Sequence, residues 1–97
     1  MNQIMTRDQL VSWLYENGPK FPEPILRSMI TLTVILNRPN SRHRTTRIEL
    51  AREWNCQPRW AHERLRDMSK LGLLQYEMTY AGEFASYYFF RLGPEQP

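Results

Sequence analysis

The sequence predicts an α+β fold that is mostly helical, and three observations support this class. Apolar residues recur at helical spacing in four segments between residues 7 and 71, each bordered by capping residues or prolines. The spacing changes to a period of two after Gly72, which is typical of strands. The 97 residues, 41% hydrophobic and 12% aromatic, supply one core and not two. We therefore expect a single domain over residues 1–97.

The first two helices are expected over residues 7–16 and 24–37. Thr6 and Gln9 have the spacing of a capping box before the first helix, whose apolar stripe is Leu10, Val11, Trp13 and Leu14. Pro24 suits the first turn of the second helix because it has no N–H to leave unpaired. This second helix is apolar on more than one face, so we expect it to be the central core element.

A pair of helices joined by a three-residue turn is expected within residues 46–71. Thr46 and Glu49 form a second capping box, and the short helix that follows should turn inward Ile48, Leu50, Ala51 and Trp54. After the turn at residues 55–57, Pro58 begins a helix that ends near Lys70, with Gly72 as a left-handed cap. Its inner face is predicted to contain Ala61, Leu65 and Met68.

The alternating pattern after Gly72 predicts a two-stranded hairpin over residues 73–92 and a frayed tail over residues 93–97. Four consecutive aromatic residues occupy positions 87–90 in the returning strand. A two-stranded hairpin buries one face, so two of these four rings should remain near the surface.

Positive charge is concentrated in one part of the chain. The formal net charge is +3, but residues 38–70 hold nine bases against four acids, a net of +5. Residues 38–47 contain four arginines and one histidine with no acid. Arginine forks suit phosphate oxygens and guanine edges, so this bias favours a nucleic-acid partner over a solvated basic loop.

Several function classes find no support in the sequence. One cysteine and two histidines are too few for a disulfide framework or a structural zinc site, so we expect no metal and no cofactor. There is no Gly-rich phosphate loop, nucleophile motif or metal-spaced cluster, so we expect no enzyme. No apolar run approaches the length of a membrane span, and no secretory signal pattern opens the chain. We expect a cytoplasmic protein.

The order of two helices, a short turn, Gly and a hairpin resembles winged helix-turn-helix proteins, most closely the MarR-like pattern over residues 46–74. The residues that carry the resemblance are Leu50, Ala51, Trp54, Cys56, Ala61, Leu65 and the run Leu71, Gly72, Leu73 and Leu74. The full expected fold is a winged helix-turn-helix with an extra N-terminal helix and a C-terminal two-stranded β-wing. The small size is similar to that of short phage or plasmid regulators.

The resemblance implies sequence-specific binding to double-stranded DNA, with the helix after Pro58 in the major groove. The residues expected to read bases are Gln57, Arg59, Trp60, His62, Glu63 and Arg66. The residues expected to contact the DNA backbone are Arg42, His43, Arg44 and Arg47. A transcriptional regulator that forms a homodimer, through the N-terminal helix or the aromatic strand, fits this function.

A protein partner is the alternative. The expected hairpin tip, residues 81–85, contains Glu83 and no base, whereas wings that contact DNA usually carry Arg or Lys. Exposed aromatic residues are typical anchors of protein interfaces. The candidate protein contacts are Trp13, Trp60 and Phe84. In this alternative the domain is an interaction module, such as a replication factor or an inhibitor.

Overall fold

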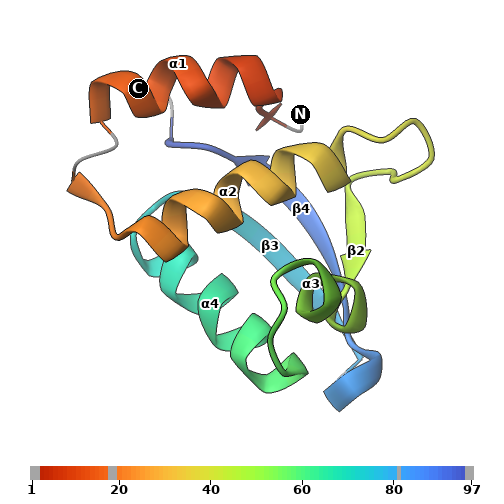
Figure 1. The fold of residues 1–97 in the computed structure, drawn as a ribbon. Coiled ribbons are helices and arrows are strands. Elements are labelled where there is room, and N and C mark those ends of the chain that lie inside the picture. Colours follow the sequence, from red (N-terminus) through yellow and green to blue (C-terminus); the bar gives the residue numbers. More distant parts are fainter. Residues whose placement is uncertain (1–2, 18–19, 81, 96–97) are drawn as a thin grey trace.

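The computed structural model describes residues 3–17, 20–80 and 82–95, and it has the expected α+β class (Figure 1). Its α-helices are α1 (Arg7–Asn17), α2 (Glu23–Leu36), α3 (Arg47–Glu53) and α4 (Pro58–Lys70). Its strands are β1 (Gln3–Ile4), β2 (Arg44–Thr46), β3 (Leu74–Thr79) and β4 (Ser86–Leu92), with the short 3-10 helix η2 (Gly82–Phe84) before β4. The four predicted helices agree with α1 to α4 within a residue or two at each end.

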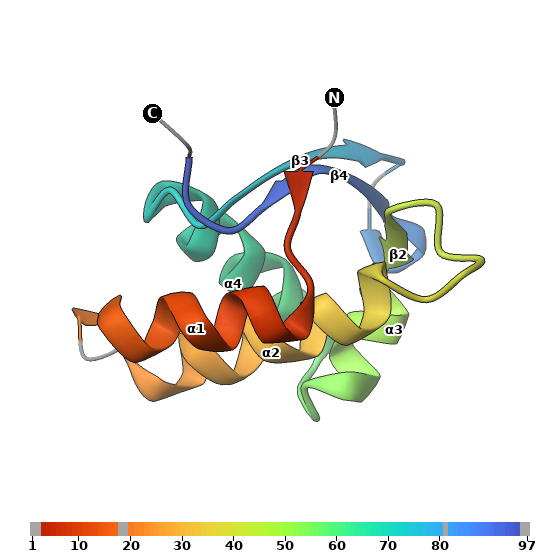
Figure 2. The same cartoon turned by 90° about the horizontal axis from the view of Figure 1, so that it is seen from above.

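In the described part of the chain the sheet has four strands, which corrects the two-stranded prediction. Strand β3 pairs antiparallel with β4 along its whole length. The other edge of β4 is shared by two short strands, with β2 antiparallel against residues 86–88 and β1 parallel against residues 91–92. The helices α1 to α4 lie on one side of this sheet, and no described helix covers its other side (Figure 2). Strand β4, near the C-terminus, therefore pairs with β1 near the N-terminus as well as with β2 and β3.

The core lies between the sheet and the helices. Helix α2 contributes the largest share of the fully buried residues, among them Met29, Leu32, Ile35 and Leu36. Strand β4 faces them with the rings of Tyr87 and Phe89, which are 1% and 0% exposed. The predicted inner face of α4 is confirmed, since Ala61, Leu65 and Met68 are all fully buried. Helix α2 is thus the central core element that its apolar composition predicts.

The helix ends carry the predicted caps. Thr6 and Gln9 bond reciprocally, with the Thr6 N–H donating to Gln9 Oε1 over 2.9 Å and the Gln9 N–H donating to Thr6 Oγ1 over 3.2 Å. The Thr46 hydroxyl accepts from the Glu49 N–H over 3.1 Å. Gly72 has φ +77°, and hydrogen bonds from its N–H to the Ser69 carbonyl and from the Leu73 N–H to the Met68 carbonyl close α4.

Two further predictions are wrong. Ile48 is 39% exposed, because α3 packs on its neighbours through Leu50 and Ala51. The tail is not frayed at its start, since Gly93 is buried and its N–H donates to the Leu73 carbonyl over 2.7 Å. Residues 96–97 of that predicted tail lie outside the described part of the chain.

Candidate nucleic-acid interface

Helix α4 presents a row of exposed polar side chains away from the core. Arg59, Glu63 and Arg66 are exposed and follow one another at spacings of four and three residues, so they share a face. Trp60 is 48% exposed, and the Arg59 guanidinium lies over its ring at 5.0 Å. This arrangement confirms that Trp60 points outward. It also leaves a face with two arginines, a carboxylate and an indole open to a ligand.

Gln57 precedes this face as the N-cap residue of α4. It is exposed, and its side chain makes no capping hydrogen bond. Its carbonyl accepts the N–H groups of Trp60 and Ala61 over 3.0 and 3.1 Å. The backbone of Gln57 therefore begins the helix, while its side-chain amide is not needed for the cap.

His62 is not part of the outward face, which corrects the prediction. It is half-buried, and its Nδ1 lies 3.1 Å from the hydroxyl of Tyr87 on β4. The same hydroxyl accepts from Nε–H of Arg47, the first residue of α3, over 2.7 Å. A tyrosine hydroxyl has a single proton, so Tyr87 is free to donate it to His62. When Nδ1 of His62 carries no proton, the hydrogen bonds therefore run from Arg47 to Tyr87 to His62.

The surroundings of this chain of bonds disfavour a charged His62. Burial lowers the pKa of His62 below its ordinary value of 6.5, and the positive charges of Arg47 and then Arg66 lower it further. The nearby Glu63 carboxylate acts in the opposite direction. Burial also raises the pKa of the Tyr87 hydroxyl, so Tyr87 stays protonated. Arg47, His62 and Arg66 thus form an electrostatically coupled group between α3, α4 and the sheet.

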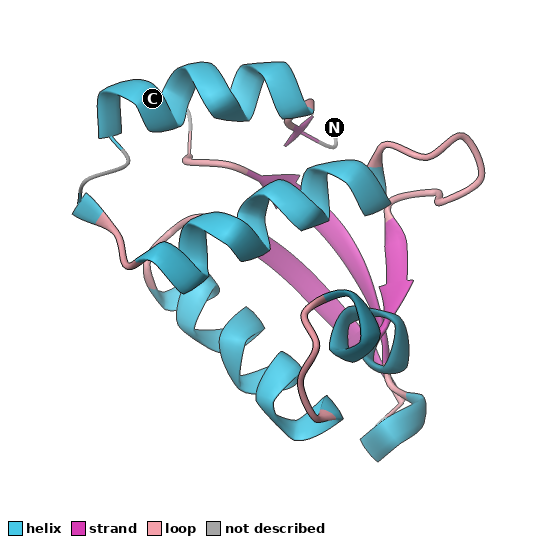
Figure 3. Ribbon diagram, in the orientation of Figure 1, coloured by secondary structure: helices cyan, strands magenta, loops and turns pink. Residues whose placement is uncertain are grey.

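The basic segment before α3 forms a loop and the strand β2. Figure 3 shows a loop that projects between the end of α2 and β2. Within it, Arg42 and His43 have positive φ angles of 52° and 61°. The Ser41 hydroxyl donates to the Leu36 carbonyl over 2.7 Å and accepts from the His43 N–H over 3.2 Å. Ser41 therefore holds the turn that positions the arginines.

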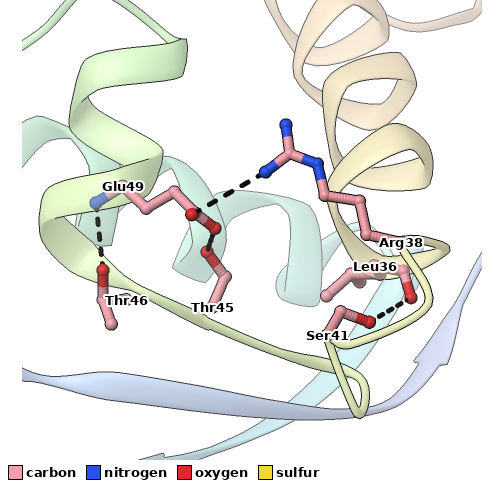
Figure 4. Close-up of polar contacts among 6 residues, drawn as sticks. All are labelled: Leu36, Arg38, Ser41, Thr45, Thr46 and Glu49. Carbon is pink, nitrogen blue, oxygen red and sulfur yellow. Dashed lines mark hydrogen bonds and ion pairs between the residues drawn. The ribbon is translucent and has the colours of Figure 1, made fainter.

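Glu49 ties this loop to α3 (Figure 4). Its carboxylate accepts from the Thr45 hydroxyl over 2.5 Å and lies 3.8 Å from Nη1 of Arg38. The groove beside these contacts has a volume of about 620 Å³. Its walls include Arg38, Ser41, Arg44, Thr45 and Glu49. Arg38 thus forms an ion pair with the Glu49 carboxylate at one wall of this groove.

The predicted backbone contacts do not lie together. Arg47 joins His62 on the helical side of the sheet, through the Tyr87 hydroxyl. Arg44 belongs to β2, where its register partner is Tyr88, and its guanidinium lies 5.2 Å from the centre of that ring. Its neighbour Thr45 is 4% exposed and faces the core, so Arg44 points to the side of the sheet that carries no described helix. The structure therefore separates Arg44 from the face of α4.

The candidate protein contacts differ in accessibility. Phe84 in η2 is 79% exposed. Trp13 is half-buried, with its ring 5.8 Å from that of Phe21. Leu10 is fully buried against the core and cannot contribute to a dimer contact through α1, whereas Tyr15 on that helix is 90% exposed. Of the predicted hairpin tip, Ala81 lies outside the described residues.

Sequence reasoning missed the role of Tyr87 and the existence of β2. The alternation of residues 86–92 indicates which rings are buried, but it does not indicate what a buried hydroxyl contacts. Strand β2 is only three residues long, too short for a period of two to stand out. The signal that could have found it is the pair Thr45 and Thr46, because β-branched residues favour strands.

Among the described residues, no group of histidine, cysteine and carboxylate side chains is placed to hold a metal ion. No helix in the same part of the chain is both long and apolar enough to cross a membrane. Comparison with family models, with curated proteins and with solved structures finds no match to this chain.

Proposed function

We propose that this protein binds double-stranded DNA through a winged helix-turn-helix, with α4 in the major groove. The order α3, turn, α4 and hairpin supports this assignment. Asn55 supports it further, because its φ of 51° allows the sharp turn between the two helices. The hairpin of β3 and β4 would be the wing.

The observation that carries the proposal is the exposed face of α4. Arg59 and Arg66 are seven residues apart, which is about 10 Å along the helix. An α-helix fits the major groove, and both arginines could then reach base edges or phosphates. Glu63 lies between them and could accept a hydrogen bond from cytosine. Arg47 adds a further positive charge near this face, since its charge lowers the pKa of His62 on α4.

A transcriptional regulator that reads two half-sites as a homodimer is the form of this function that we favour. Dimeric helix-turn-helix proteins bind half-sites one helical turn apart. The exposed side chain of Tyr15 on α1 supports a contact between copies at that helix. Sedimentation of the protein with and without DNA would measure the number of copies bound.

The test is a titration of the protein into a pool of duplex DNA at two salt concentrations. We expect binding at low salt that weakens as salt rises, because phosphate contacts release counterions. The double variant Arg59→Ala with Arg66→Ala should lose most of this affinity and its preference among sequences. Arg27→Ala is the matched control, since Arg27 is an exposed arginine on α2 that pairs with Glu23. Unchanged binding by the double variant would overturn the proposal.

Binding of a protein partner is the second candidate, and the exposure of Trp60 and Phe84 favours it. Large exposed aromatic side chains are frequent anchors of protein interfaces. The supporting result is a complex that survives nuclease treatment and is lost in Trp60→Ala or Phe84→Ala. Loss of the complex on nuclease treatment alone would count against this function.

A further inference from the structure

The side of the sheet without described helices carries aromatic and basic residues that the proposed duplex interface does not use. Thr45, Tyr87 and Phe89 are buried on the helical side, so the residues that alternate with them point the other way. Across three neighbouring strands, Arg44, Tyr88 and Glu77 are register partners on this outer face. Phe90 follows Tyr88 by two residues on the same face and is 37% exposed. We call the set of Arg44, Glu77, Tyr88 and Phe90 the outer-face row.

The outer-face row is ordered by its own contacts. The rings of Tyr88 and Phe90 meet edge to face, with centroids 5.0 Å apart. The Arg44 guanidinium lies over Tyr88 at 5.2 Å. Such a pair of rings and a stacked arginine combine apolar area with positive charge at one place.

Positive charge continues from the row into the loop before β2. No acid occurs between residues 38 and 48. The His43 carbonyl accepts from the Phe89 N–H over 2.9 Å, so the end of this loop is fixed to β4 beside Tyr88. Arg42 is exposed and lies two residues before Arg44, a separation of at most about 7 Å along the chain. An anion bound near Tyr88 would therefore be within reach of both arginines.

We propose that the outer-face row binds single-stranded nucleic acid. Unpaired bases stack on Phe90 and Tyr88, and Arg42 and Arg44 contact the phosphates between them. Every base has an aromatic face, and stacking on protein rings beside a basic surface is a general way of binding a single strand. Glu77, next to Tyr88, accepts hydrogen bonds from amino groups and so favours cytosine, adenine and guanine over thymine or uracil.

Charge and shape favour a single strand over the other occupants of a sheet face. In a duplex the base faces are covered by neighbouring bases, so rings on a sheet have nothing to stack on. An acidic peptide would match the arginines but would leave the rings without a flat partner. The row lies on the opposite side of the sheet from α4, so this inference does not rest on the proposed function.

The experiment compares variants for binding to a fluorescent single strand of about 12 nucleotides and to the same strand paired with its complement. Phe90→Leu and Tyr88→Leu keep apolar volume but remove the ring, and we expect each to weaken single-strand binding about tenfold. Arg44→Gln should lower the salt dependence of single-strand binding by about 0.7 in the log–log slope. Glu77→Gln should reduce the preference for cytosine over thymine strands.

Three controls distinguish binding at the outer-face row from binding elsewhere on the protein and from loss of the fold. Arg27→Gln removes an exposed arginine on α2, on the helical side of the sheet, and it should leave the salt dependence of single-strand binding unchanged. Thermal melting checks that each variant is folded. If Tyr88→Leu does not fold, Phe90→Leu alone tests whether the rings of the outer-face row contribute to single-strand binding. An RNA strand of the same sequence tests whether the sugar contributes, because only RNA offers a 2′-hydroxyl.

The outcomes distinguish this inference from the proposed function. Loss of single-strand binding in the ring variants, with duplex binding retained, supports the outer-face site. Single-strand binding that is absent at low salt, or equal in wild type and ring variants, overturns it. Loss in Arg59→Ala with Arg66→Ala but not in the ring variants also overturns it, since the strand would then lie on α4. Absence of duplex binding alone would overturn only the proposed function.

Discussion

At the residue scale, the Tyr87 hydroxyl is the point where three elements meet. It accepts from Arg47 on α3 and lies within hydrogen-bond distance of His62 on α4, while its ring belongs to β4. The ring is 1% exposed and packs edge-on against Tyr76 at 5.5 Å. One buried side chain therefore sets the positions of two residues that the sequence pattern assigns to DNA contact.

Tyr87→Phe should destabilise the protein by roughly 1–3 kcal/mol. The ring and its packing remain, but Arg47 and His62 lose a partner in a partly buried setting, which costs more than an exposed hydrogen bond. Urea unfolding followed by circular dichroism measures the change. Tyr76→Phe is the control, since among the described residues the Tyr76 hydroxyl makes no hydrogen bond, and its loss should cost less. Equal effects of the two variants would contradict this role of Tyr87.

His62 makes stability depend on pH. Its pKa in the folded protein lies below 6.5, the value of an unperturbed histidine. In the pH range between these two values the unfolded chain binds more protons than the folded one, so stability rises with pH there. This contribution is fully present above pH 6.5 and is lost as the pH falls below it.

The measurement compares unfolding free energies near pH 7.5 and pH 5.5, about one unit on each side of the ordinary histidine pKa. Wild type should lose more stability on acidification than His62→Gln, because glutamine does not titrate. If wild type and His62→Gln lose the same amount, the lowered pKa of His62, ascribed to burial and then to Arg47 and Arg66, is wrong.

At the element scale, caps and turns explain why the helices could be predicted from sequence. The pairs Thr6 with Gln9 and Thr46 with Glu49 sit at the start of helices, and Gly72 closes α4 as its position indicates. These are local features, readable from a few adjacent residues. The inward prediction for Ile48 is wrong because a seven-residue helix makes two turns, and which side of them faces the core depends on distant elements.

The sheet is harder to predict because its pairing also depends on elements that are distant in the sequence. Strands β1 and β2 are two and three residues long, and each exists only because β4 offers it an edge. Pairing between residues so far apart in sequence leaves no local period. The separation of Arg44 from α4 follows from β2, so the sequence could propose the individual site residues but not how they divide between two faces.

Substitution by alanine should lower the stability of the protein by different amounts at two glycines. Gly72, with φ +77°, has open space where a Cβ would lie, so Gly72→Ala should cost only the left-handed backbone, about 1 kcal/mol. Gly93 has φ +118°, and a Cβ there would collide with the side chain of Met5, so Gly93→Ala should cost about 2–4 kcal/mol.

Thermal unfolding of both variants measures whether Gly93→Ala destabilises the protein more than Gly72→Ala does. Met5 also donates its N–H to the Leu92 carbonyl, so a shift of Met5 would disturb the pairing of β1 with β4. Gly93→Ala with Met5→Ala should recover part of the loss, because the smaller side chain removes the collision. A larger effect at Gly72 than at Gly93 would contradict the packing described for the end of β4.

At the scale of the whole molecule, stability should be uneven between the two sides of the core. Strand β4 is paired along both edges and has Tyr87, Phe89 and Leu92 in the core. Helix α1 packs against α2 and has one fully buried residue, Leu10, with Trp13 and Leu14 half-buried. Separation of α1 from α2 would expose less apolar surface than unfolding of the whole core, so this opening requires less free energy than global unfolding.

Native-state hydrogen exchange measures this difference. Amide protons of α1 should exchange through an opening that depends less on denaturant than global unfolding does, whereas those of β4 should exchange only with global unfolding. Leu10→Ala should lower the protection of α1 by about 2–5 kcal/mol while reducing that of β4 by no more than the loss in global stability. Equal protection of α1 and β4 in wild type would show that α1 unfolds together with the sheet. The low cost of opening α1 matters for the proposed homodimer, because a second copy that covered α1 would raise its protection as the protein concentration increases.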